Sequence, residues 1–299
     1  MAPFFLLALE VVPSYPPMTY STLVSAPEIQ TSLGSPDWIV FDVRHDLSDP
    51  SAGEAAYEAG HIPGAHFLHL DRDLSTDPTG HNGRHPLPSP EAFAELLSRH
   101  GVGPSTQIVA YDAHGGMFAS RLWWMARWIG HEAVAVLDGG LLAWIKYGGE
   151  IDTDRPAPCA AGAIKARTSL VEHVGVGQVL SNLQDRQKLV IDARSPDRFR
   201  GENETIDPVG GHIPGAVNRF FKNNLAEDGR FKPAADLLVE WKSVMGGRKA
   251  SELILHCGSG VTACHNLLGL EIAGLSGAGL YAGSWSEWCS DPSRPFEVG

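Results

Sequence analysis

Cysteine is scarce in this chain, with four residues among 299. So few cysteines in so long a chain do not form a disulfide framework, and we expect reduced thiols in a reducing compartment, the cytoplasm. Charged residues make up 19% of the sequence, and the formal net charge is −12. This negative charge argues against a general nucleic-acid binder and against an anionic membrane surface as partner.

Long apolar runs are also missing near the N-terminus. The stretch Phe4–Val12 is too short to cross a bilayer, has no Lys or Arg before it, and is interrupted by Glu10. It therefore suits neither a membrane span nor a signal peptide. Met18 follows two prolines and precedes a more ordinary beginning. We expect residues 1–17 to be a disordered extension or an upstream start-site artefact.

The chain contains one pattern twice. Ile39–Arg44 resembles Leu189–Arg194, and Gly60–Ala65 is repeated letter for letter as Gly211–Ala216, about 150 residues later. A period of this length is typical of a duplicated domain. We expect the Asp-x-Arg pairs and the His-Ile-Pro-Gly turns in both copies to be structural. The predicted units are an N-terminal domain at 18–150, a linker at 151–168 and a C-terminal domain at 169–299.

Strands and helices alternate within each copy. The clearest segments are predicted strands at 107–111 and 252–256 and predicted helices at 90–100 and 234–245. This alternation predicts an α/β fold, in which each domain has a mostly parallel sheet with helices on both faces. Functional sites in such sheets lie at the carboxyl ends of the strands.

Cys257 stands at such a strand end. It follows the apolar run Leu253–Leu255 and precedes Gly-Ser-Gly and a helical pattern that ends at Gly274. Backbone N–H groups and the helix dipole favour an anion there, and such sites lower a cysteine pKa from about 8.5 to roughly 3.5–7.5. The first copy has Asp112 in the place of Cys257. Only the second copy can perform thiolate chemistry, and we expect the first to form one wall of a cleft.

These motifs together carry a family resemblance. The paired Asp-x-Arg and Gly-His-Ile-Pro-Gly-Ala elements, the loop Cys-Gly-Ser-Gly-Val-Thr-Ala-Cys and the terminal Gly-Ser-Trp-Ser-Glu-Trp resemble the tandem-domain rhodanese superfamily, the thiosulfate and 3-mercaptopyruvate sulfurtransferases. The resemblance implies two tandem rhodanese-like domains and a Cys257 that cycles through a persulfide. It implies no metal and no organic cofactor.

The loop after Cys257 indicates the sulfur donor. Family members that prefer thiosulfate carry basic residues there, whereas those that prefer 3-mercaptopyruvate look like this chain, whose loop has no charge. We therefore expect 3-mercaptopyruvate as donor, with thiosulfate as the alternative. The expected acceptor is cyanide or a thiol, such as thioredoxin or a low-molecular-weight thiol, and the chain is expected to be a monomer or weak dimer. The N–H groups expected to hold the transferred sulfur lie within Gly258, Gly260, Val261 and Thr262.

Further site residues follow from the resemblance alone. The family's first substrate arginine falls on Arg198, and the second falls near Thr205, where no arginine stands. Arg219, after the same turn, is predicted to reach the pocket instead. The family's proton relay maps onto Ser259, His61 and Asp49, although His61 equally suits a structural turn.

Three alternative functions are considered by the residues that each would require. A cysteine-dependent phosphatase needs an Arg six residues after the Cys, where this chain has Ala263. A thiol redox sensor or persulfide carrier would use Cys257 with Cys264 as the resolving thiol. A zinc site lacks a paired Cys-x-x-Cys spacing among its candidate ligands, which are Cys257, Cys264, His265 and Cys289.

Overall fold

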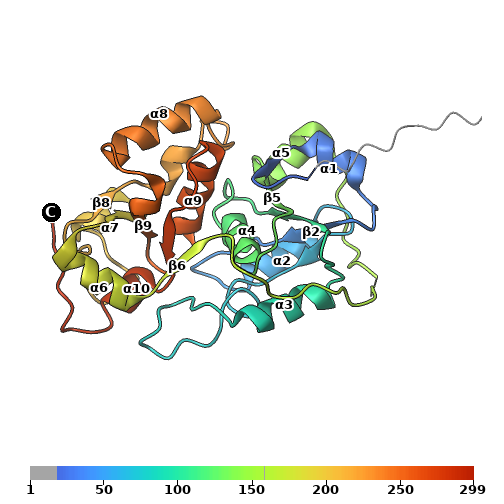
Figure 1. Cartoon of the computed structure of the whole chain (residues 1–299). Helices are drawn as coiled ribbons and strands as arrows, with labels where there is room; N and C mark the ends of the chain where they lie inside the picture. Colours follow the sequence, from blue (N-terminus) through green and yellow to red (C-terminus); the bar gives the residue numbers. More distant parts are fainter. Residues whose placement is uncertain (1–18, 158) are drawn as a thin grey trace, which may run out of the picture.

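The computed structural model describes residues 19–157 and 159–299, so the prediction for residues 1–17 lies outside the described residues. Two domains of the same design lie side by side (Figure 1). Every helix within the described ranges is too short or too polar to cross a membrane.

The first domain is built on a parallel sheet of five strands in the order β1-β5-β4-β2-β3. Its elements are β1 (Leu23–Val24), α1 (Ala26–Ser32), β2 (Trp38–Asp42), α2 (Ala52–Ala59), β3 (His66–Phe67), α3 (Pro90–Arg99), β4 (Gln107–Tyr111), α4 (Ala119–Trp128), β5 (Val134–Leu137) and α5 (Gly140–Tyr147). Side chains of the central strand β4 are buried on both faces, because successive residues point to opposite sides of a sheet. Helices therefore cover both faces, as the sequence predicts.

The second domain repeats this arrangement, with five parallel strands in the order β6-β10-β9-β7-β8. Its elements are β6 (Glu172–Val174), α6 (Val176–Asp185), β7 (Leu189–Asp192), α7 (Pro196–Arg200), β8 (Val217–Asn218), the 3₁₀ turn η1 (Phe221–Asn224), α8 (Ala234–Met245), η2 (Ala250–Glu252), β9 (Leu253–His256), α9 (Thr262–Ile272), β10 (Gly279–Tyr281) and α10 (Ser284–Trp288). Strand for strand, this order equals that of the first domain. The prediction of two tandem domains with parallel sheets is confirmed.

Local sequence signals set the element ends. Helix α3 starts where Ser89 accepts a hydrogen bond from the N–H of Ala92 at 3.1 Å and Pro90 occupies the first turn. Strand β4 and helix α8 have the predicted bounds. Strand β9 starts one residue later than predicted, because residues 250–252 form a 3₁₀ turn.

The Asp-x-Arg pairs clamp the strand ends in both domains. Arg44 binds the Asp42 carboxylate at 2.6 Å and donates to the carbonyl of Gly60 at 2.7 Å. Arg194 makes the same contacts with Asp192 and with the carbonyl of Gly211. Each pair thus ties a strand to the following Gly-His-Ile-Pro turn, which confirms the structural role predicted for them.

Helices α4 and α9 join the two domains. Both are buried along most of their length, and one apolar core continues across them from the first domain into the second. In Figure 1 these two helices lie at the centre of the molecule. Because α9 begins directly after the loop of Cys257, this packing brings that loop against the first domain.

Candidate active site

Cys257 follows the carboxyl end of β9 and is 2% exposed. The N–H of Gly260 donates to its Sγ at 3.2 Å. The start of α10 anchors the loop from behind: Ser284 Oγ accepts from the N–H of Cys257 at 3.1 Å, and the N–H of Trp285 donates to the carbonyl of Cys257 at 3.0 Å. The sulfur therefore sits in a fixed loop and accepts a backbone N–H of that loop.

Two glycines allow this loop to form. Gly260 has a φ of +76°, and a Cβ there would lie 2.3 Å from the carbonyl oxygen of Ala282. A Cβ on Gly258 would lie 3.1 Å from a guanidinium nitrogen of Arg84. Larger residues at either position would disturb the loop or the cations beside it.

The first domain shows what such a loop binds. Its counterpart of Cys257 is Asp112, a fully buried residue. The Asp112 carboxylate accepts four backbone N–H groups, from His114, Gly116, Phe118 and Ala119, at 2.7–3.0 Å. The fold thus forms a cradle for an anion at this strand end, and in the first domain a side chain of the chain itself fills it.

A cavity of about 290 Å³ opens beside Cys257. The first domain contributes Leu47, Arg84 and Met117 to its wall, which confirms the predicted cleft. Of the predicted site residues, the cavity is lined by Cys257, Gly258, Ser259, Val261, Thr262 and Arg198. Gly260 instead reaches the sulfur through its N–H.

Two arginines lie beside Gly258, and sequence reasoning found one of them. Arg198 pairs with Glu204 at 2.8 Å and with Asp207 at 3.1 Å. Arg84, from the first domain, pairs with the same Asp207 at 2.6 Å. Both guanidinium groups lie next to Gly258, and both are compensated by carboxylates.

The prediction for Arg219 is wrong. Its guanidinium binds Glu240 at 2.8 Å and lies over the ring of Trp241, with 5.0 Å from Cζ to the ring centroid. Arg219 is 4% exposed and does not line the cavity. Its side chain turns toward α8, where a carboxylate and an aromatic face receive the charge.

The relay predicted from His61 and Asp49 is also corrected. His61 stacks on Tyr57, with 3.9 Å between ring centroids, and its Nδ1 contacts the carbonyl of Tyr57 at 2.8 Å. Asp49 accepts hydrogen bonds from Ser51 at the start of α2. Both residues stabilise local turns of the first domain, and neither lines the cavity.

The structure brings a different histidine to Ser259. The Nδ1 of His85 lies 2.7 Å from Ser259 Oγ, and its Nε2 lies 3.2 Å from Asp71 Oδ1. Burial lowers the pKa of His85, which the nearby Asp71 partly offsets. The hydrogen bond from His85 lowers the pKa of Asp71. At neutral pH, His85 is thus neutral, donates through Nε2 to the Asp71 carboxylate and accepts the Ser259 hydroxyl proton at Nδ1.

A sequence signal for these residues exists. Arg84, His85 and Asp71 all lie in the connection from β3 to α3, residues 68–89, which is longer than its counterpart at 219–233. An extra-long connection in the copy that lacks the cysteine indicates residues that can reach the loop of the other copy.

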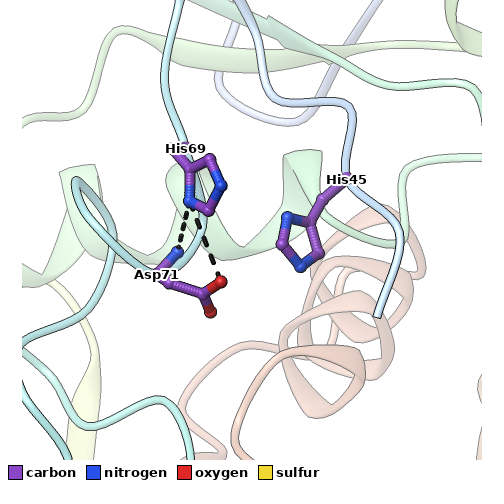
Figure 2. A group of neighbouring side chains, drawn as sticks. All are labelled: His45, His69 and Asp71. Carbon is purple, nitrogen blue, oxygen red and sulfur yellow. Dashed lines mark hydrogen bonds and ion pairs between the residues drawn. The ribbon is translucent and has the colours of Figure 1, made fainter. Parts of the chain in front are cut away.

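His45, His69 and Asp71 lie close enough together to be considered as metal ligands (Figure 2). The Nε2 of His69 is 2.9 Å from the carbonyl of Pro50, and its Nδ1 accepts the N–H of Asp71 at 3.1 Å. Both His69 nitrogens are therefore engaged, and Asp71 serves His85. These contacts hold Asp71 beside His69, and they leave no free lone pair on His69 for a metal ion.

The predicted alternative zinc ligands are engaged elsewhere. Cys264 donates its thiol proton to the carbonyl of Gly260 at 3.3 Å, and His265 Nε2 contacts the carbonyl of Gly115 at 3.0 Å. Burial raises the pKa of Cys264 to about 12. Cys264 is therefore a neutral packing residue under the loop.

Comparison with known proteins gives consistent results. The model of the "Rhodanese-like domain" family matches residues 25–147 and 176–291. A Pseudomonas aeruginosa protein named "Probable 3-mercaptopyruvate sulfurtransferase" is 43% identical, over 94% of this chain and 100% of its own. Thiosulfate sulfurtransferase of Rattus norvegicus is 34% identical, over 90% and 92%. The crystal structure of an Escherichia coli 3-mercaptopyruvate sulfurtransferase matches with a TM-score of 0.75 at 31% identity, over 88% of this chain and 98% of that one.

Proposed function

The chain belongs to the rhodanese family and is a sulfurtransferase, and we propose that it moves sulfur from 3-mercaptopyruvate to a thiol through a persulfide on Cys257. The contact of Ser259 with His85 and Asp71 carries this proposal. Removing sulfur from 3-mercaptopyruvate leaves a carbon that must be protonated, whereas sulfite, the leaving group from thiosulfate, needs no such proton. A positioned relay beside the nucleophile is therefore expected for the first donor and has no task with the second.

The first half-reaction forms the persulfide. The Cys257 thiolate attacks the donor's thiol sulfur, so that an S–S bond forms, the C–S bond breaks, and its electron pair moves to carbon as the enolate of pyruvate. The thiol proton of the donor passes to Ser259 Oγ while Ser259 gives its own proton to His85. Return of a proton from Ser259 to the enolate carbon completes pyruvate and restores neutral His85. Asp71 stabilises His85 while it is protonated.

The second half-reaction removes the sulfur. A thiolate acceptor attacks the outer sulfur of the persulfide, the S–S bond of Cys257 breaks, and the electron pair restores the Cys257 thiolate. We propose that the N–H groups of residues 258–262 hold the negative charge of the outer sulfur. The four N–H groups on the Asp112 carboxylate support this role, since the twin loop holds an anion in the same way.

Two arginines are proposed to bind the donor's carboxylate and ketone. Arg198 and Arg84 stand beside Gly258, one from each domain. Arg84 thereby takes the part of the second substrate arginine that is missing near Thr205. Because Asp207 pairs with both guanidinium groups, the positive charge of these two arginines is largely compensated. This balance suits the monoanion of 3-mercaptopyruvate better than the dianion of thiosulfate.

Two steady-state assays test the proposal. Pyruvate release from 3-mercaptopyruvate is compared with thiocyanate formation from thiosulfate and cyanide, each with Cys257→Ala as control. We expect a higher kcat/KM for 3-mercaptopyruvate and no turnover in Cys257→Ala. A higher kcat/KM for thiosulfate would overturn the donor, and activity in Cys257→Ala would overturn the nucleophile. The likeness to thiosulfate sulfurtransferases makes thiosulfate the second candidate.

A further inference from the structure

Arg121 is a buried cation of the first domain. It lies on α4, at the junction of the domains, and is 0% exposed. The buried arginines are Arg44, Arg121, Arg194 and Arg219, and all except Arg121 pair with a carboxylate of the chain. Within the described ranges, Arg121 has no ion pair. An uncompensated buried charge is strongly unfavourable, so a compensating anion is expected close to it.

The guanidinium of Arg121 connects both parts of the active site. It donates to the carbonyls of Gly260 at 3.0 Å, His85 at 3.0 Å and Leu74 at 3.2 Å. Its Nε has no hydrogen-bond partner among the described residues. Carbonyl oxygens supply only partial charges, so these contacts orient the cation but do not neutralise it. Gly260 belongs to the loop of Cys257, and His85 belongs to the relay.

Two thiols are the candidates for the compensating anion. Burial lowers the pKa of Arg121, while Cys264, through its charge and a side-chain hydrogen bond, and Cys257, through its charge, act in the opposite direction. Cys264 is excluded, because burial raises its pKa to about 12 and its thiol donates to the carbonyl of Gly260. Cys257 remains, and its sulfur accepts the N–H of the same Gly260 whose carbonyl binds Arg121.

We propose that Arg121 is the buried counter-ion of Cys257, which it holds as an anion, thiolate before sulfur transfer and persulfide after it. Arg121 acts as a positioning residue through its charge and through its hydrogen bond to Gly260. Its charge is not neutralised by any described carboxylate, and its hydrogen bond fixes Gly260, whose N–H points at the sulfur. The domain without a nucleophile would thus supply charge to the domain that has one. This inference rests on the proposed role of Cys257.

Other charged or titratable groups lie around the loop of Cys257, and their effects must be separated from that of Arg121. The groups are Arg84, Arg194, Arg198 and Lys222 in the cavity wall, His85 through Ser259, Cys264 below the loop, and His256 with Asp192 behind it. The three cavity arginines are paired with carboxylates, and Lys222 is exposed to water. Arg121 differs from all of them in being both buried and unpaired.

The test measures how fast iodoacetamide alkylates Cys257 as a function of pH. Mass spectrometry of the Cys257 peptide in the full chain separates this thiol from the other three cysteines. Arg121→Gln keeps a donor for Gly260 but removes the charge, and Arg121→Lys keeps the charge. Arg219→Met, which removes a buried arginine outside the cavity, is the matched control.

We expect the pH midpoint of alkylation to rise by about one unit or more in Arg121→Gln. At a pH below the midpoint, this rise corresponds to a tenfold smaller fraction of Cys257 thiolate. Arg121→Lys should recover most of this shift, and Arg219→Met should not move it. An unchanged midpoint in folded Arg121→Gln would overturn the proposal. A rise of one pH unit in the alkylation midpoint of Arg121→Lys would also overturn it. If Arg121→Gln does not fold, the result with Arg121→Lys decides alone. Alkylation needs no sulfur donor, so this failure is distinct from failure of the proposed function.

Discussion

Replacement of His85 by Gln tests the relay most directly. The imidazole lies 2.7 Å from Ser259 Oγ and 3.2 Å from Asp71 and is buried. Gln cannot accept the Ser259 proton as a base, so the enolate of pyruvate would have to take its proton from water. Positioned acid–base groups contribute about 10²–10⁴-fold in rate. This range corresponds to about 3–5 kcal/mol of barrier. Because the thiolate and its cradle stay intact, we expect a loss near the lower end, about 10²-fold in kcat.

The assay compares the two donors in the same protein. With thiosulfate, the variant should keep its rate within about threefold, since no carbon is protonated in that transfer. His61→Gln is the matched control, because His61 stacks in its own turn and does not line the cavity. An equal loss with both donors would show that His85 only supports the structure. A selective loss in His61→Gln would refute the relay derived from the structure.

Three further predictions concern the same site. Burial lowers the pKa of His85, so the rate with 3-mercaptopyruvate should fall only as the pH drops below about 6.5. Because Asp71 raises the pKa of His85, Asp71→Asn should move this limb to lower pH, and a move upward in the pH–rate profile would contradict the relay. Asp112→Ala leaves four buried N–H groups without an acceptor and should lower the free energy of unfolding, measured in urea, by at least about 3 kcal/mol. A decrease of less than about 1 kcal/mol would argue against the anion cradle. Cys264→Ser should keep most of the turnover, since Cys264 is neutral and a serine hydroxyl can donate to the same carbonyl of Gly260. Strong loss of turnover together with loss of a response to oxidants would favour the redox-sensor alternative.

Several features of the fold and site follow from short stretches of sequence. The repeated strands and turns predict two parallel sheets, and both sheets have the same strand order. The Asp-x-Arg clamps join residues two positions apart, and the loop of Cys257 lies between its own strand and helix. Interactions of this kind depend on residues that are close in the chain, so their spacing carries the information. The missing charge in residues 258–262 is visible in the same way.

The first domain's contributions to the site depend on contacts between distant residues. His85 and Ser259 are 174 positions apart, and Arg121 and Gly260 are 139 positions apart. His85 and Asp71 lie in the longer connection between β3 and α3, which has no periodicity. The family resemblance therefore predicts His61 and Asp49 in their place. Contacts between distant residues also explain why the sequence prediction for Arg219 was wrong and why Arg84 was missed.

The sequence by itself determined the two-domain fold, the proposed nucleophile Cys257 and the glycine loop around it, because each is encoded locally. Tertiary structure alone decided which histidine, aspartate and arginines of the first domain lie beside the loop of that cysteine. Packing of α4 against α9 brings them together across the domain junction, and no spacing along the chain records that contact.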